Sequence, residues 1–265
     1  RKGFRMGHAD VKDHMFLDGL EDAYEEGKLM GSFAEDTAEH YQFTREQQDN
    51  FAITSLERAK KANEDGTFES EIVPIKILNR KNEIIINKDE QPFKSDITKI
   101  PTLRPAFRKN GTVTAANSSS ISDGASSVIL MLESEAQKRG IKPLARIIDH
   151  STNSQEPKWF TTAPIGAIEK VLEKSGWKKT DVDLFEVNEA FAVVPMAVMK
   201  DIGISNDILN IYGGACALGH PVGASGTRIV TTLINALKKN NLKKGLASLC
   251  IGGGEATALT LEIIN

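Results

Sequence analysis

The pattern of apolar and polar positions changes along the chain, and its first 110 residues are polar and irregular. The clearest element there is a helix predicted over residues 44–66, because Thr44 and Gln47 form a capping box and Gly66 lies beyond the end. One narrow face of this helix carries small and apolar side chains, namely Phe51, Ala52, Ser55, Leu56 and Ala59. Residues 71–78 and 83–87 predict two strands, the first confined to an edge by Pro74. Residues 94–107 predict a loop broken by prolines.

From about residue 142 onward, strands and helices alternate. Helices are predicted over residues 164–177, 189–203 and 224–241, and the first of them has Pro164 near its start and Gly176 at its end. Strands are predicted over residues 182–187, 208–211, 246–252 and 256–264. This alternation indicates a layered α/β fold. The nearly continuous apolar strands are typical of a sheet that is covered on both faces.

Composition and charge narrow the classes of protein. The 265 residues carry a net charge of −3 and are 40% hydrophobic, which favours a globular protein without a nucleic-acid partner. No apolar run reaches the roughly 20 residues that a membrane span needs, and we expect no signal peptide. Two cysteines favour a reducing compartment, and five scattered histidines lack the spacing of metal ligands. The chain starts at Arg1 with a basic, polar segment, so we expect a processed chain or a piece of a longer one.

Three short segments carry residues that could perform chemistry. Residues 213–229 place five glycines around His220, between a predicted strand and a helix, although such turns also serve tight packing alone. Cys250 ends an apolar strand and precedes three glycines, whose N–H groups could form an oxyanion hole, although most free cysteines are inert and buried. Asn188 and Glu189 follow a strand, where the Asn is either a helix cap or an amide that orients a water or a thioester oxygen.

Together these segments resemble the signatures of the thiolase family, the acyl-CoA C-acetyltransferases. The resembling segments are NEAFA, GGACALGHPVGASGTRI and CIGGG, supported by LRPAF at residues 103–107 and GTVTAANSSSISDGAS at residues 111–126. The resemblance implies a thiolase-like layered α-β-α-β-α fold of the α/β class, with an inserted loop domain and an incomplete N-terminal half-domain. It divides the chain into a loop domain that covers coenzyme A (CoA) at residues 1–110, the end of the N-terminal domain at 111–141 and the C-terminal domain at 142–265.

The resemblance also assigns roles to residues. By motif, Cys250 matches the acid/base thiol, and His220 matches the residue that activates the nucleophile and donates to a thioester oxygen. Asn188 matches the residue that positions a water in the same oxyanion hole, and the Gly252 N–H matches a donor of a second one. The matches to the pantetheine pocket are Met30, Phe107, Ala115, Ser119 and Phe191. The chain departs from the family at Leu29, often His, and at Ser120, often Gly, while Lys94 could replace an Arg near the adenine end.

The family's nucleophilic Cys lies in a segment resembling Val-Cys-(Ala/Gly)-Ser-Gly, which this sequence does not contain. We therefore expect this chain alone to be inactive, with the missing part in the same or another chain. It is a fragment of a thiolase, one half of a split enzyme, or a degenerate protein that binds CoA; the intact Asn188, His220 and Cys250 favour the first two. The first residues resemble the family's tetramerisation loop and imply a dimer of dimers. Short-chain acyl-CoA is implied as substrate, with no permanently bound cofactor, in the cytoplasm.

Two other functions remain open. A ketosynthase of the same superfamily would use a Cys-His-His or Cys-His-Asn site, and Cys250 in its CIGGG context disfavours this alternative. A scaffold that binds CoA without catalysis would keep its affinity for CoA when Cys250 is replaced by Ala, whereas an enzyme would lose turnover.

Overall fold

The computed structural model describes residues 3–79 and 82–264. The helices are α1 (Met30–Tyr41), α2 (Arg45–Glu64), α3 (Gln91–Lys94), α4 (Glu133–Lys138), α5 (Ala163–Ser175), α6 (Val193–Val198), α7 (Ala215–Leu218) and α8 (Ser225–Lys239). The strands are β1 (Ile75–Asn79), β2 (Asn82–Ile86), β3 (Ala145–Ser154), β4 (Leu184–Val187), β5 (Lys244–Ile251) and β6 (Glu255–Ile263). Arg1 and Lys2, within the predicted tetramerisation loop, lie outside the described residues.

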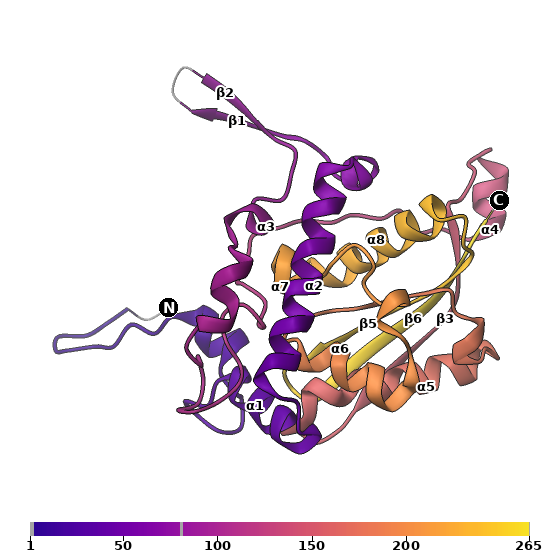
Figure 1. Cartoon of the computed structure of the whole chain (residues 1–265). Helices are drawn as coiled ribbons and strands as arrows, with labels where there is room; N and C mark the ends of the chain where they lie inside the picture. Colours follow the sequence, from indigo (N-terminus) through magenta and orange to yellow (C-terminus); the bar gives the residue numbers. More distant parts are fainter. Residues whose placement is uncertain (1–2, 80–81, 265) are drawn as a thin grey trace.

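A four-stranded sheet forms the centre of the molecule, with the strand order β3-β6-β5-β4. β6 is antiparallel to both β3 and β5, whereas β4 runs parallel to β5. Helix α5 packs on β3 and β6, and α8 packs on β4 and β5, on opposite faces of the sheet (Figure 1). This arrangement confirms the prediction of an α/β sheet covered on both faces.

The alternation of side chains along β4 shows how the two faces are filled. Leu184 joins an apolar cluster with Leu233 and Leu237 of α8. Phe185, the next residue, joins a different cluster with Ile168 of α5 and Val194 of α6. Successive side chains of a strand point to opposite faces, so both clusters are built from one short apolar segment.

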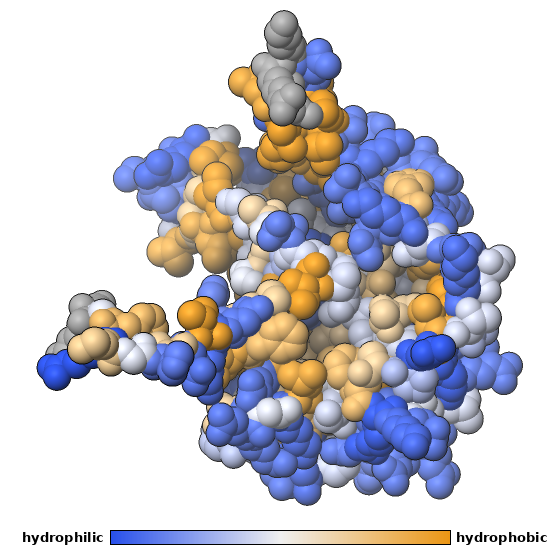
Figure 2. Space-filling model, turned by 90° about the vertical axis from the view of Figure 1, so that its left-hand side faces the viewer, coloured by the Kyte–Doolittle hydropathy of each residue, from blue (hydrophilic) through white to orange (hydrophobic). Residues whose placement is uncertain are grey.

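In the first half of the chain, α1 and α2 lie against this core. Helix α2 begins with the predicted capping box, in which Thr44 and Gln47 exchange hydrogen bonds, and Gly66 follows its end in a left-handed conformation. β1 and β2 form an antiparallel ribbon that projects from the molecule (Figure 1). Figure 2 shows apolar residues gathered on this ribbon; Ile75, Ile77, Leu78, Ile84 and Ile85 are exposed.

Two predicted elements are wrong, and one observed strand was not predicted. Residues 208–211 form no strand: Leu209 makes only an isolated bridge to Phe185, because Asn210 has a positive φ of 46° and its side chain bonds the backbone of Val187. The helix predicted from residue 189 begins only at Val193. β3 was not predicted because it is an edge strand in which all residues but one are exposed or half-buried, so it lacks a continuous apolar signal.

Candidate active site

The carboxyl ends of the parallel strands β4 and β5 bring Asn188 and Cys250 to the same edge of the sheet. Asn188 directly follows β4, and its N–H donates to Ser248 O of β5 at 3.0 Å. Cys250 lies two residues further along β5 and is 8% exposed. The interpretation of Asn188 as a helix cap is wrong, since the next helix begins five residues later. Its buried amide is therefore available to the site.

His220 is held at this edge through both ring nitrogens. Asn188 Nδ2 lies 3.3 Å from His220 Nε2, and Ser225 Oγ lies 2.5 Å from His220 Nδ1. The backbone N–H of His220 donates to Ser120 O at 3.0 Å. Ser225, the first residue of α8, also bonds Pro221 O at 3.1 Å. The imidazole is thus fixed in position and orientation between two neighbours.

The hydroxyl of Ser225 allows both tautomers of His220. When the hydroxyl donates to Pro221 O, its oxygen accepts from a protonated Nδ1, and Nε2 accepts from Asn188. When the hydroxyl turns and donates to Nδ1, the proton of the neutral ring lies on Nε2. In that state Nε2 no longer accepts from Asn188 Nδ2, and both groups can donate a hydrogen bond to an oxygen at the edge of the sheet.

Burial keeps both titratable groups of the site neutral near pH 7. Burial, together with the smaller effect of the nearby positive charge of Arg228, lowers the pKa of His220 to about 4. Burial also raises the pKa of the Cys250 thiol to about 12. A thiolate formed at Cys250 would therefore be a strong base, as abstraction of a weakly acidic proton requires.

Two further features of this edge are typical of a site that receives a ligand. Asn188 Oδ1 is buried and has no hydrogen-bond partner within the described part of the chain. The backbone after Cys250 is closely approached by α1, since a Cβ at Gly252 would lie 2.9 Å from Met30 Sδ. The structure therefore places Met30 of the predicted pantetheine pocket beside the predicted donor Gly252.

The aromatic residues predicted for the pantetheine pocket lie together. The rings of Phe107 and Phe191 meet edge to face, with centroids 5.9 Å apart. Ser119 follows the bridge between Ser118 and Phe191, and its N–H and hydroxyl both donate to Ala190 O at 3.0 Å. Because the hydroxyl hydrogen is engaged, the Ser119 oxygen is left as an acceptor for a ligand N–H.

Ala115 lies on the wall of a cavity of about 260 Å³. This cavity is also lined by Lys94, Ser120, Leu56 and Cys216, from α2, α3 and α7 as well as the loop. Two positions predicted from the sequence, Ala115 and Lys94, thus share one cavity. The ammonium group of Lys94 is exposed and lies 3.7 Å from Glu90.

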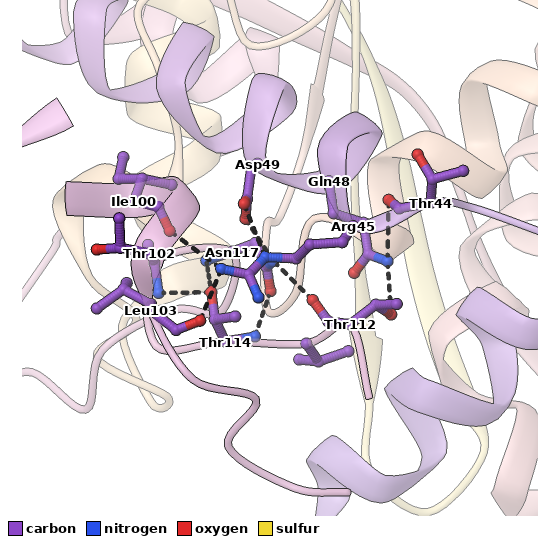
Figure 3. A network of polar contacts seen from close by, with 12 residues as sticks. Thr44, Arg45, Gln48, Asp49, Ile100, Thr102, Leu103, Thr112, Thr114 and Asn117 are labelled. Atoms are coloured by element: carbon purple, nitrogen blue, oxygen red, sulfur yellow. Dashed lines mark hydrogen bonds and ion pairs between the residues drawn. The ribbon is translucent and has the colours of Figure 1, made fainter. Parts of the chain in front are cut away.

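A polar network anchors the loop that carries Phe107 and Ala115 to α2 (Figure 3). Arg45 bonds Asp49 at 2.7 Å and also donates to the carbonyl groups of Ile100 and Leu103. Asp49 accepts from Asn117 Nδ2 at 3.0 Å, and Asn117 Oδ1 accepts from the N–H of Thr114. The loop is therefore fixed on both sides of Phe107 by groups of one helix.

Two residues that hold the groups of this edge in place were not predicted from the sequence. Ser225 binds the ring of His220, but a Ser at a helix start gives no distinguishing signal in a single sequence. Glu189 was noticed beside Asn188 without a role, and the structure buries its carboxylate completely. Over residues 3–79 and 82–264 no group of three or more His, Cys, Asp or Glu is arranged to hold a metal ion, and no helix is long and apolar enough to cross a membrane.

Comparisons with known families give matches along nearly the whole chain. Residues 1–134 match the model of the thiolase N-terminal domain, and residues 141–263 match that of the thiolase C-terminal domain. Part of the N-terminal domain is therefore present in this chain. The probable acetyl-CoA acetyltransferase of Dictyostelium discoideum is 51% identical over 99% of the chain and 63% of its own length. The acetyl-CoA acetyltransferase of Shinella zoogloeoides is 47% identical over 98% of the chain and 66% of its own length.

Solved structures share the fold. A crystal structure of the Bacillus anthracis acetyl-CoA acetyltransferase superimposes with a TM-score of 0.94 at 43% identity, covering 100% of this chain and 67% of that one. The Acat5 thiolase of Ascaris suum, in complex with coenzyme A, gives a TM-score of 0.89 at 38% identity and covers the same shares. The predicted thiolase-like fold is thereby confirmed. The chain spans about two thirds of the length of the relatives it matches.

Proposed function

The chain belongs to the thiolase family, and on this premise we propose that it acts as an acetyl-CoA C-acetyltransferase on short-chain 3-ketoacyl-CoA such as acetoacetyl-CoA. The observation that carries this proposal is the link between Asn188 and His220 at the edge where Cys250 ends its strand. The names of the acetyl-CoA acetyltransferases at 46–51% identity also support it.

We propose that Cys250, as its thiolate, removes a proton from the methyl group of acetyl-CoA and becomes a thiol. The thiol first loses its own proton, to solvent water or to the CoA sulfur that leaves in acyl transfer. The carbanion is delocalised as an enolate, whose oxygen becomes negative and must be stabilised by hydrogen-bond donors. His220 Nε2 donates when Ser225 donates to Nδ1, and a water bound to Asn188 Oδ1 supplies the second donor. The buried setting strengthens both hydrogen bonds. In cleavage, Cys250 returns the proton to the leaving enolate.

Substrate binding follows the pocket described above. Met30, Phe107 and Phe191 pack along the pantetheine arm, Ser119 accepts from one of its amide N–H groups, and the Gly252 N–H stabilises the oxyanion of acyl transfer. The cavity of Ala115 and Lys94 takes a more distant part of the CoA molecule. CoA thus binds as a substrate and not as a resident cofactor.

The nucleophilic thiol is proposed to come from another segment of the same protein or from a second chain. The motif contexts of Cys216 and Cys250 do not match the family's nucleophile, and Cys216 contacts the backbone oxygen of Glu189. We further propose a dimer of dimers in the cytoplasm. The two free cysteines support a reducing compartment.

The proton-transfer step can be tested without the nucleophile. Exchange of the acetyl-CoA methyl protons in D2O, followed by NMR, reports deprotonation by Cys250 directly. We expect the wild-type protein to catalyse exchange and Cys250→Ala to lower its rate by about 100-fold or more, because an acid/base group is lost. CoA affinity measured by calorimetry and the melting temperature should stay unchanged.

Two outcomes contradict the proposal. Exchange by Cys250→Ala at the wild-type rate would exclude Cys250 as the base. Binding of CoA by the wild-type protein without any exchange would favour a protein that binds CoA without catalysis. Cleavage of acetoacetyl-CoA then tests the complete reaction, in a preparation that also carries the nucleophilic thiol.

A further inference from the structure

Glu189 is a completely buried carboxylate directly beside Asn188, and the mechanism above does not use it. Its carboxylate accepts hydrogen bonds from three groups: Ser55 Oγ at 2.7 Å, Cys216 N at 3.1 Å and Asn210 Nδ2 at 2.8 Å. The first two reach Oε2 and the third reaches Oε1. Both oxygens are therefore engaged, and by donors from distant parts of the chain.

These donors connect three elements. Ser55 belongs to α2, Cys216 belongs to α7, and Asn210 is bound to the backbone of Val187 at the end of β4. Ser55 Oγ in turn accepts from the N–H of Gly214 at 3.0 Å. The carboxylate also packs directly on Gly214, where any Cβ would collide with it.

The segment held in this way leads to His220. α7 is a single turn between Gly214 and Gly219, and His220 directly follows Gly219. Asn188 is covalently adjacent to Glu189 and touches the ring of His220. The carboxylate of Glu189 thus anchors the start of the segment 214–220, and His220 lies at the end of that segment. Asn188, the neighbour of Glu189 in sequence, contacts the imidazole of His220.

We infer that Glu189 is a positioning residue that sets the distance and angle between Asn188 and His220. The effect of this positioning on catalysis rests on the proposed function. The positioning itself is a property of this chain and does not depend on that function. Burial raises the pKa of Glu189, and the hydrogen bonds from Ser55, Asn210 and the Cys216 N–H oppose that rise. The three donors therefore favour the carboxylate form that accepts at both oxygens.

A glutamine cannot replace Glu189 without leaving a donor unpaired. The Cys216 N–H is fixed by the backbone, and the orientation of the Asn210 amide is fixed because its Oδ1 accepts from Val187 N at 2.8 Å. These two donors face different oxygens, and a Gln offers one oxygen and one NH2 group. One donor would meet the NH2, and the glycine-rich segment would move away to relieve the contact.

Glu186 offers a matched control. It lies on the same strand end, is also fully buried, and has Oε1 without a hydrogen-bond partner in the described part of the chain. Burial raises its pKa to about 8, so it is largely protonated at pH 7. Its charged neighbour Arg228 lies 3.7 Å from Oε2, beyond hydrogen-bond distance, so a Gln in its place removes no hydrogen bond. Glu189→Gln and Glu186→Gln therefore make the same chemical change at two buried positions near the end of β4. They differ in the number of hydrogen-bond donors that contact the carboxyl group.

The test compares the two variants with the wild type by three measurements. We expect Glu189→Gln to speed amide hydrogen exchange over residues 214–220 by at least about tenfold and to shift the 15N signals of the His220 ring. We expect it to lower methyl-proton exchange of acetyl-CoA by about 100-fold, the typical effect of a misplacement near 1 Å. Glu186→Gln should match the wild type in all three. Ser55→Ala, which removes one donor and keeps the carboxylate, should give a smaller effect in the same direction.

The outcomes separate the two proposals. If the wild type shows no methyl exchange but Glu189→Gln still shifts His220, the proposed function fails and the positioning role stands. If Glu189→Gln leaves the amides and the His220 signals unchanged, or if Glu186→Gln alters them equally, the positioning role is wrong. Should Glu189→Gln fail to fold, Ser55→Ala decides by the same His220 and amide readouts.

Discussion

His220 is neutral at pH 7 because its ring is buried, and this has a consequence for stability. Its pKa is lowered to about 4, while the unfolded chain titrates near 6.5. As the pH falls from about 6.5 to 4, the unfolded imidazole takes up a proton that the folded one does not. The stability present above pH 6.5 is therefore lost through this window, by at most about 3 kcal/mol.

His220→Gln should remove this loss. We expect the free energy of unfolding of the wild type, measured by urea denaturation, to fall more steeply between pH 7 and pH 4 than that of the variant. The difference between the two curves isolates His220 from all other titrating groups. Parallel curves would show that the imidazole takes up its proton in the folded state as easily as in the unfolded one.

Helix α2 stabilises the site by anchoring the loop of Phe107 and Ala115. Asp49 is 4% exposed and joins Arg45 to Asn117, so Asp49→Asn turns an NH2 group toward donors and loses the ion pair. We expect a loss of about 2–4 kcal/mol in the free energy of unfolding, since one partner of a buried pair is removed. The measurement is chemical denaturation at pH 7.

Glu46→Gln is the control for this variant, because Glu46 is an exposed residue of the same helix. Its effect should stay within about 0.5 kcal/mol. A loss at Asp49 no larger than that at Glu46 would mean that the network of Figure 3 adds nothing to stability.

The elements that the sequence predicts well are those whose ends are determined locally. The capping box at Thr44 and the left-handed Gly176 mark helix ends through contacts within a few residues, and both are confirmed. Residues 208–211 have the apolar pattern of a strand, yet Asn210 replaces a strand ladder by side-chain bonds to Val187. Whether residues 208–211 form a strand therefore depends on Val187, more than 20 residues away in sequence. A local pattern of apolar residues does not contain this information.

The same distinction applies to the site. Asn188, His220 and Cys250 are recognisable because each stands in a compact motif at a strand end or beside a glycine-rich turn. The partners of Glu189 are far apart in sequence, since Ser55 lies 134 residues before it. The hydrogen bonds around the buried carboxylate of Glu189 form only when α2 packs against the sheet.

At the scale of the whole molecule, apolar burial is concentrated around the four-stranded sheet, and the β1–β2 ribbon stands outside it. Within the described ranges, β1 and β2 contact each other far more than they contact any other element. Leu78 is 83% exposed. An isolated two-stranded ribbon is at best marginally stable in water. The ribbon should therefore contribute almost nothing to the cooperative unfolding of the core.

This predicts that the ribbon can be removed. Ile75 and Ile86 are paired in register, so their Cα atoms lie about 5 Å apart, and a linker of four Gly and Ser residues can replace residues 75–86. We expect the melting temperature, measured by calorimetry, to change by less than about 2 °C, since exposed side chains carry little stability. A fall of more than about 5 °C would mean that the apolar side chains of the ribbon are covered in solution, and sedimentation velocity of the two proteins would then show whether a second copy of the chain covers them.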